Sequence, residues 1–74
     1  MTELDLRGLR CPLPALRTAR QLAEMATGET LTVLADDPLA AIDIAHLCRT
    51  EGHDLVEQRQ DGEGGRFVIV AGGA

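Results

Sequence analysis

The sequence predicts an α/β fold, a two-layer sandwich in which two helices cover one face of a four-stranded mixed sheet. Short stretches of alternating apolar and polar residues, typical of strands, are interleaved with two longer stretches whose apolar residues recur at helical spacing. A polar, glycine-rich segment separates the last two strands. Helices that follow the first two strands give crossover connections, and the simplest packing places both on one sheet face. The predicted order is β-α-β-α-β-β, in a single domain over residues 1–74.

The first strand and the first helix occupy the N-terminal part of the chain. Residues 3–7 alternate between apolar and polar side chains, which places Leu4 and Leu6 on one face of a strand. Residues 12–26 are predicted as a helix, and Gly28 suits the left-handed position that ends it. The buried face of this helix is predicted from its apolar positions: Leu16, Ala19, Leu22, Ala23 and Ala26.

The second strand and the second helix repeat this arrangement. Residues 29–35 alternate again, with an inner face of Leu31, Val33 and Ala35. The run Asp36-Asp37-Pro38 is typical of a helix start, because an acidic residue caps the first N–H groups and a following proline loses no hydrogen bond. This helix is predicted to run to about Glu51, before Gly52. Its buried face would be Ala41, Ile44, Ala45 and Cys48.

The last two strands are predicted at about residues 54–60 and 66–71. The segment 61–65 between them is polar and rich in glycine, which is typical of a hairpin turn. It lacks the lysine and the strand-loop-helix setting of a phosphate-binding loop. We therefore expect two antiparallel neighbours at the C-terminal end of the chain.

The composition excludes several classes of protein. The two cysteines, Cys11 and Cys48, are too few and too far apart for a disulfide framework or a zinc site, so stability must come from the apolar 45% of the chain. No apolar stretch approaches the ~20 residues of a membrane span. The acidic N-terminus is unlike a signal peptide, and with free thiols it predicts a cytoplasmic protein. A net charge of −5 with a single aromatic argues against strong nucleic-acid binding. We expect a monomer.

Cys11 is the candidate reactive residue. It follows the turn Gly8-Leu9-Arg10 and lies at the start of the predicted helix, where the macrodipole presents partial positive charge. Arg10 and Arg7 add positive charge, while Asp5 opposes them. Such surroundings lower the pKa of a thiol to roughly 3.5–7.5. We therefore predict an exposed thiol with a lowered pKa, the alternative being a small side chain that fills space in the core.

Two prolines follow the cysteine, and both have a structural reason. The first N–H groups of a helix have no partner within it, so Pro12 loses no hydrogen bond there. Pro14 biases Leu13 toward extended backbone, so the helix can also begin at Pro14. Either start makes the segment 12–14 a stiff mount for the thiol of Cys11.

The run from Leu4 to Pro14, LDLRGLRCPLP, resembles the signature of the TusA/SirA-like sulfurtransferases, a Cys-Pro-x-Pro motif shortly after a Leu-Asp…Gly segment. The resemblance continues through residues 28–31, 35–38, 43–44, 48 and 52–53, and covers nearly the whole chain in order. The residues that carry or support the motif are Gly8, Arg10, Cys11, Pro12 and Pro14.

The resemblance implies a sulfurtransferase that works as a carrier, with Cys11 as the one residue that does covalent chemistry. Its thiol would take a sulfane sulfur from a cysteine desulfurase or a rhodanese-like donor and hold it as a persulfide. The persulfide sulfur would then pass to a cysteine of an acceptor protein. Related proteins serve tRNA thiolation, molybdenum cofactor synthesis, or sulfur oxidation and thiosulfate use. The resemblance implies no metal and no organic cofactor.

Two other functions stay open at this point. One is a non-catalytic regulatory or RNA-binding module of the same fold, although the charge and the absence of lysine leave little to contact phosphates. The other is a thiol oxidoreductase, which the absence of a second cysteine near Cys11 disfavours. Cys48 is expected in the core, with a resolving thiol as its alternative.

Other polar residues have structural explanations that we prefer to functional ones. The pair Asp36-Asp37 is expected to cap a helix, with acid/base chemistry as the alternative. His46 and His53 lack a cluster of ligands, so we expect solvated or locally hydrogen-bonded side chains rather than a metal site. Asp43 is expected at a solvated helix position, with partner selection as its alternative.

Overall fold

The computed structural model describes residues 2–61 and 64–72. Within these residues the chain forms four strands and two helices: β1 (Thr2–Asp5), α1 (Leu13–Ala23), β2 (Thr30–Ala35), α2 (Ala40–Glu51), β3 (Asp54–Asp61) and β4 (Gly64–Val70). This order confirms the predicted β-α-β-α-β-β arrangement. Residues 62 and 63 of the predicted hairpin turn lie outside the described residues.

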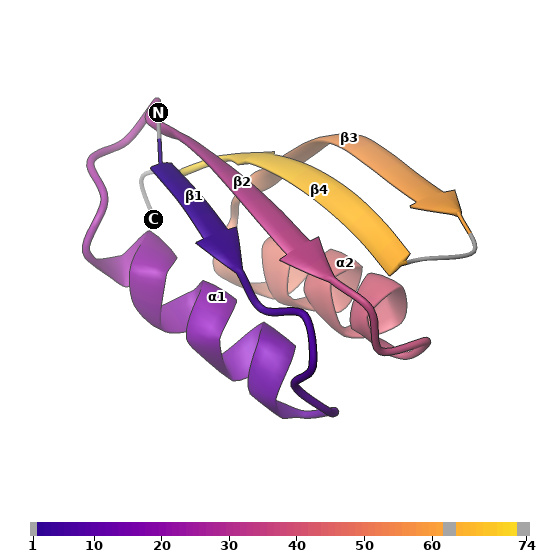
Figure 1. Ribbon diagram of the computed structural model, residues 1–74. Coiled ribbons are helices and arrows are strands. Elements are labelled where there is room, and N and C mark those ends of the chain that lie inside the picture. Colours follow the sequence, from indigo (N-terminus) through magenta and orange to yellow (C-terminus); the bar gives the residue numbers. More distant parts are fainter. Residues whose placement is uncertain (1, 62–63, 73–74) are drawn as a thin grey trace.

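The strands form one mixed sheet in the order β1-β2-β4-β3. β1 and β2 are parallel, as a crossover through α1 requires, whereas β4 is antiparallel to both β2 and β3. Figure 1 shows both helices on the same face of this sheet, with the other face left open. The predicted two-layer sandwich is therefore confirmed.

The core lies between the sheet and the helical layer. Its largest fully buried apolar side chains come from β2, α2 and β4 and include Leu31, Val33, Ile44, Phe67 and Ile69. The predicted inner face of β2 is buried as expected, and so is most of the predicted face of α2, with Ala45 half-buried. Packing of these apolar side chains holds α2 firmly against the sheet.

The buried face of α1 differs from the prediction. Its buried side chains are Pro14, Thr18 and Leu22, spaced four residues apart. Thr18 is tolerated in the core because its Oγ1 donates a hydrogen bond to the Pro14 carbonyl, 2.7 Å away. Of the predicted face only Leu22 is buried, whereas the remaining positions are exposed or half-buried: Leu16, Ala19, Ala23 and Ala26.

Two helix ends also differ from the prediction. α1 ends at Ala23, and Gly28 lies beyond it in a loop, where its left-handed backbone lets its N–H donate to the Ala71 carbonyl at 2.8 Å. α2 begins at Ala40 rather than at Pro38. Asp37 therefore does not cap the helix itself; it caps the turn just before it.

The parallel pairing of β1 and β2 decides where the two helices start. Both strands end at the same edge of the sheet, so the loops that follow them, residues 6–12 and 36–39, leave from one end of the molecule. The first turns of α1 and α2 begin there too, and the two helices pack against each other. Among the described residues, neither helix is long and apolar enough to cross a membrane.

Candidate functional site

Cys11 lies in the loop 6–12, between the end of β1 and the start of α1. Its side chain is exposed, as predicted, so it is not a space-filling core residue. Pro12 occupies the N-cap position of α1, which begins at Leu13, between the two predicted starts. Pro14 lies in the first turn and is buried, so it anchors this end of the helix beneath the cysteine loop.

Two carboxylates of the loop 36–39 hold the cysteine loop in place. The N–H of Gly8 donates to Asp36 Oδ1 and the N–H of Cys11 donates to Asp37 Oδ2, each at 2.9 Å. Gly8 has a φ of +89°, a left-handed conformation that side chains disfavour, which is why glycine suits this turn. The acidic pair therefore joins the two loops. The predicted capping of α2 by this pair is wrong, because no side chain of the described residues caps that helix.

The sulfur of Cys11 has a partner that the sequence did not predict. Its Sγ donates a hydrogen bond to Asp43 Oδ2, with 2.9 Å between the two atoms. Asp43 lies in the first turn of α2, at the edge of the sheet that also carries the cysteine. The sequence contains only an indirect signal for this contact. Asp43 is an acidic residue early in the helix that follows β2, and that helix starts at the same edge of the sheet as the loop that follows β1.

The electrostatics of the thiol are opposite to the prediction. The pKa of Cys11 is raised, first by the hydrogen bond to Asp43, then by loss of hydration, and then by the charges of Asp43 and Asp37. The prediction of a lowered pKa is therefore wrong. The nearest charges are carboxylates, and Cys11 lies before the helix rather than within its first turn.

The arginines that were expected to stabilise a thiolate are engaged elsewhere. The guanidinium of Arg7 pairs with Asp5, with Nε 2.8 Å from Oδ1 and Nη2 2.7 Å from Oδ2. That pair lowers the pKa of Asp5 to about 2. The charge of Arg10 acts on Asp37, whose pKa is lowered mainly by the N–H groups of Cys11 and Leu39. Positive charge near the motif therefore stabilises carboxylates.

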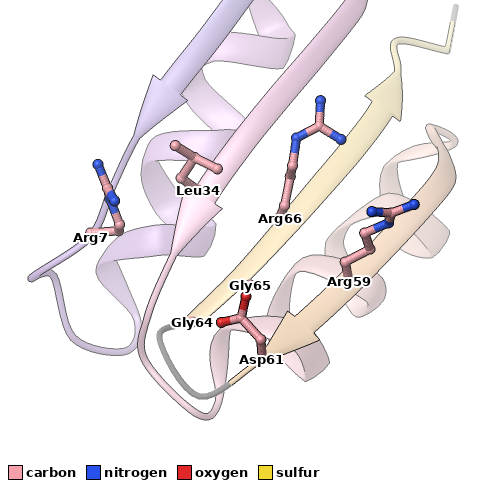
Figure 2. A pocket seen from close by; sticks show the side chains of 7 residues that line it. All are labelled: Arg7, Leu34, Arg59, Asp61, Gly64, Gly65 and Arg66. Atoms are coloured by element: carbon pink, nitrogen blue, oxygen red, sulfur yellow. The ribbon is translucent and has the colours of Figure 1, made fainter.

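Two of the hollows on the molecular surface bear on the position of Cys11, one beside the cysteine loop and one on the open face of the sheet. One of about 370 Å³ is formed by the turn 8–10 and the segment 36–38. Another, of about 300 Å³, lies on the open sheet face, where Figure 2 shows Arg59 and Arg66 on neighbouring strands and Arg7 beyond β1. Arg66 is paired there with Glu57, at 2.5 Å between Nη1 and Oε2. Cys11 lines neither hollow, and its side chain is exposed on the molecular surface.

The remaining candidate residues have structural roles. Cys48 is 3% exposed on the inner face of α2, as predicted. His46 lies 3.4 Å from the Thr50 hydroxyl, and Nδ1 of His53 accepts the N–H of Gly72 at 2.9 Å, which confirms local hydrogen bonding. Within residues 2–61 and 64–72, no three His, Cys, Asp or Glu side chains are grouped so that they could hold a metal ion.

The fold is shared with a known class of proteins. The crystal structure of a SirA-like protein from Desulfitobacterium hafniense is similar to this chain, with a TM-score of 0.82 and 31% identity over 99% of this chain and 100% of that one. The family described as sulfurtransferase TusA matches residues 2–71. The chain therefore belongs to the TusA sulfurtransferase family, which confirms the resemblance seen in the sequence and supports a sulfur-carrier role in general.

Proposed function

We propose that this protein is a persulfide carrier: Cys11 accepts a sulfane sulfur from a donor protein and passes it to a cysteine of an acceptor protein. The observation that carries the proposal is the exposed thiol on a loop anchored by Asp36 and Asp37, in a chain of the TusA family. In this proposal residues 1–74 act as one carrier domain in the cytoplasm.

Cys11 is the one residue of this chain that forms and breaks covalent bonds in this chemistry. Its thiol first loses its proton to the solvent, and the departing donor thiolate takes up a proton in turn. In loading, the thiolate of Cys11 attacks the outer sulfur of the donor's persulfide; the new S–S bond forms as the donor's S–S bond breaks, and the donor cysteine leaves as a thiolate. In unloading, the acceptor thiolate attacks the outer sulfur, and Cys11 leaves as a thiolate. One persulfide is consumed and one is formed at each step, so no external oxidant or reductant is required.

The donor of the sulfur is a cysteine desulfurase or a rhodanese-like protein. Both classes form a persulfide on their own cysteine, the first from cysteine and the second from thiosulfate. The acceptor serves tRNA thiolation, molybdenum cofactor synthesis, or sulfur oxidation and thiosulfate use. The shared requirement is a partner cysteine that reaches the exposed Sγ of Cys11.

A group of exposed apolar side chains supports docking of such a partner at the cysteine. Leu13 and Leu16 lie in the first turn of α1, and Leu39 and Ile42 lie at the start of α2. We call these four residues the apolar rim. Among the described residues, Val56 on β3 is the one other large apolar side chain exposed to this extent. Apolar surface gathered around a reactive group is typical of a binding site for another protein. The proposed occupant is the sulfur donor or acceptor.

The test is intact mass spectrometry after incubation with a donor. The protein is mixed with a desulfurase and cysteine, or with a rhodanese and thiosulfate. We expect a gain of one sulfur atom that dithiothreitol removes, that Cys11→Ser abolishes, and that Cys48→Ala leaves unchanged. No gain with either donor, together with RNA binding that survives Cys11→Ser, would instead favour a regulatory or RNA-binding module.

A further inference from the structure

We propose that Asp43 is a positioning residue of the carrier site, which holds the sulfur of unloaded Cys11 against α2 and releases it once the sulfur carries a persulfide. The inference rests on the proposed carrier function and goes beyond it, because it assigns a role to a residue outside the cysteine motif. It would make the direction in which the sulfur points depend on whether the carrier is loaded.

The geometry around the sulfur limits what can move. The backbone of Cys11 is held through its N–H by Asp37, and Asp43 is fixed on a helix whose neighbouring Ile44 is fully buried. The backbones of both residues are therefore held in place, since shifting the backbone of Asp43 would move α2 out of the core. The free motion is rotation of the two side chains on these backbones, and the 2.9 Å hydrogen bond from Sγ to Asp43 is the contact that restrains the Cys11 side chain.

Loading removes the hydrogen atom that makes this contact favourable. In the thiol, Sγ is bonded to Cβ and to one hydrogen, which it donates to Asp43 Oδ2. In the persulfide, Sγ is bonded to Cβ and to the outer sulfur, so it has no hydrogen to donate. A sulfur and a carboxylate oxygen that are both acceptors repel each other at that distance. The side chain then turns away from α2.

The outer sulfur is driven in the same direction. A persulfide is more acidic than the corresponding thiol, so at neutral pH it carries negative charge. Asp43 from α2 and Asp37 from the loop 36–39 both face this position, and each repels an anion. No positive charge in the first turn of α1 offsets this repulsion, because residues 13–16 are uncharged. The charge of Arg10 acts on the carboxylate of Asp37. A loaded sulfur therefore points away from the carboxylates, toward a docked partner.

The first test measures alkylation of the unloaded protein by iodoacetamide as a function of pH, in wild type and in Asp43→Asn. We expect the variant to have a lower thiol pKa. Each unit of that decrease raises the thiolate fraction about tenfold but lowers its nucleophilicity about threefold, so alkylation at pH 7 becomes about threefold faster. Above the pKa of both proteins the variant is no longer faster.

Matched variants make this result specific. Glu51→Gln removes the same charge from the exposed far end of α2 and is expected to leave the profile unchanged. Asp43→Glu keeps a carboxylate and is expected to return the pKa toward that of wild type. Circular dichroism checks that each variant is folded. An Asp43→Asn profile identical to that of wild type would overturn the proposal.

The second test examines the loaded state with a stable substitute. Methyl methanethiosulfonate converts Cys11 to a methyl disulfide, whose Sγ has no hydrogen, as in the persulfide. We expect the NMR signals of the Asp43 side-chain carboxyl group and of the first turn of α2 to shift in wild type, and much less at position 43 in Asp43→Asn. Unchanged Asp43 signals would contradict release. Both tests use no sulfur donor, so their failure is distinguishable from failure of loading by mass spectrometry.

Discussion

The side chain of Asp37 ties the loop that carries Cys11 to the start of α2. Its Oδ2 accepts the N–H of Cys11 at 2.9 Å, and its Oδ1 accepts the N–H of Leu39 at 2.7 Å. Cys11 and Asp37 are 26 positions apart in the sequence, so one carboxylate connects two loops that only the parallel pairing of β1 and β2 brings together. The position of the reactive cysteine therefore depends on how the second helix is packed.

This contact gives the fold an acid-sensitive component. The two N–H donors hold the pKa of Asp37 below its usual 3.8. A group whose folded-state pKa is lowered stabilises the fold above its unfolded-state pKa, and this contribution is lost as the pH falls through the folded-state pKa. We expect stability to decline below about pH 4, and Asp37→Ala to be less stable at pH 7 but less sensitive to acid. Urea unfolding between pH 7 and pH 2.5 measures both effects.

Two comparisons complete this experiment. Asp5, whose pKa is about 2 beside Arg7, contributes a dependence of the same sign, so the acid sensitivity in Asp37→Ala is reduced and not abolished. Glu51→Ala removes a carboxylate at the far end of α2 and is expected to keep the wild-type dependence. If Asp37→Ala declined with acid as steeply as wild type, the contact would contribute nothing to the folded state.

The order of the elements was predictable because it depends on local patterns. Alternation along β2 placed Leu31 and Val33 in the core, and Gly52 marked the end of α2 through its left-handed backbone. The buried face of α1 was not predictable in the same way. Thr18 is polar by type, and it enters the core only because a carbonyl one turn earlier accepts its hydroxyl hydrogen.

In the candidate site, too, the features that depend on local sequence were predictable and those that depend on contacts between distant segments were not. The exposure of Cys11 and its place before the first helix followed from the motif and from the turn at Gly8. The sign of the local charge did not, since the arginines are near in sequence whereas the contacting carboxylates, Asp37 and Asp43, come from the next crossover. Closeness in sequence favoured the arginines as neighbours of the Cys11 thiol. The parallel pairing of β1 and β2 is what brings the two carboxylates next to it.

Neighbouring isoleucines of α2 are expected to differ strongly in their contribution to stability. Ile44 is fully buried, whereas Ile42, two positions earlier, is 66% exposed. Ile44→Ala leaves a cavity between α2 and the sheet and is expected to lower the free energy of unfolding by about 2–5 kcal/mol. Ile42→Ala is expected to change it by less than about 0.5 kcal/mol. Urea denaturation of the two variants checks this, and equal losses would place the core face of α2 elsewhere.

The two cysteines are expected to differ in accessibility. Cys11 is exposed and Cys48 is buried, and burial followed by the charge of Asp54 raises the pKa of the Cys48 thiol. We expect a thiol reagent such as dithionitrobenzoate to label one thiol in the native protein and both in denaturant. Cys11→Ser should leave no rapidly labelled thiol, whereas Cys48→Ala should keep it. Fast native labelling of Cys11→Ser would show that α2 opens readily enough to expose its inner face.

The apolar rim is expected to matter for transfer from a protein donor but not for small reagents. Leu16 in the rim and Val56 on β3 are both 58% exposed, so they form a matched pair that differs in distance from the cysteine loop. Burying one such side chain against a partner contributes about 1.5–3 kcal/mol, so Leu16→Ser is expected to lower kcat/KM for sulfur loading at least tenfold. Val56→Ser is expected to leave it within about twofold of wild type.

Iodoacetamide distinguishes docking from reactivity, because this reagent reaches the sulfur without binding the rim. Alkylation of Cys11 should proceed at the wild-type rate in both serine variants, since neither substitution changes a charge near the thiol. A second rim variant, Ile42→Ser, changes the first turn of α2 in place of that of α1. It is expected to lower kcat/KM for sulfur loading as Leu16→Ser does, and it tests whether both first turns contact the donor. Equal loading of the Leu16→Ser, Ile42→Ser and Val56→Ser variants would contradict a docking role of the apolar rim, because substitutions in both first turns would then leave donor binding unchanged.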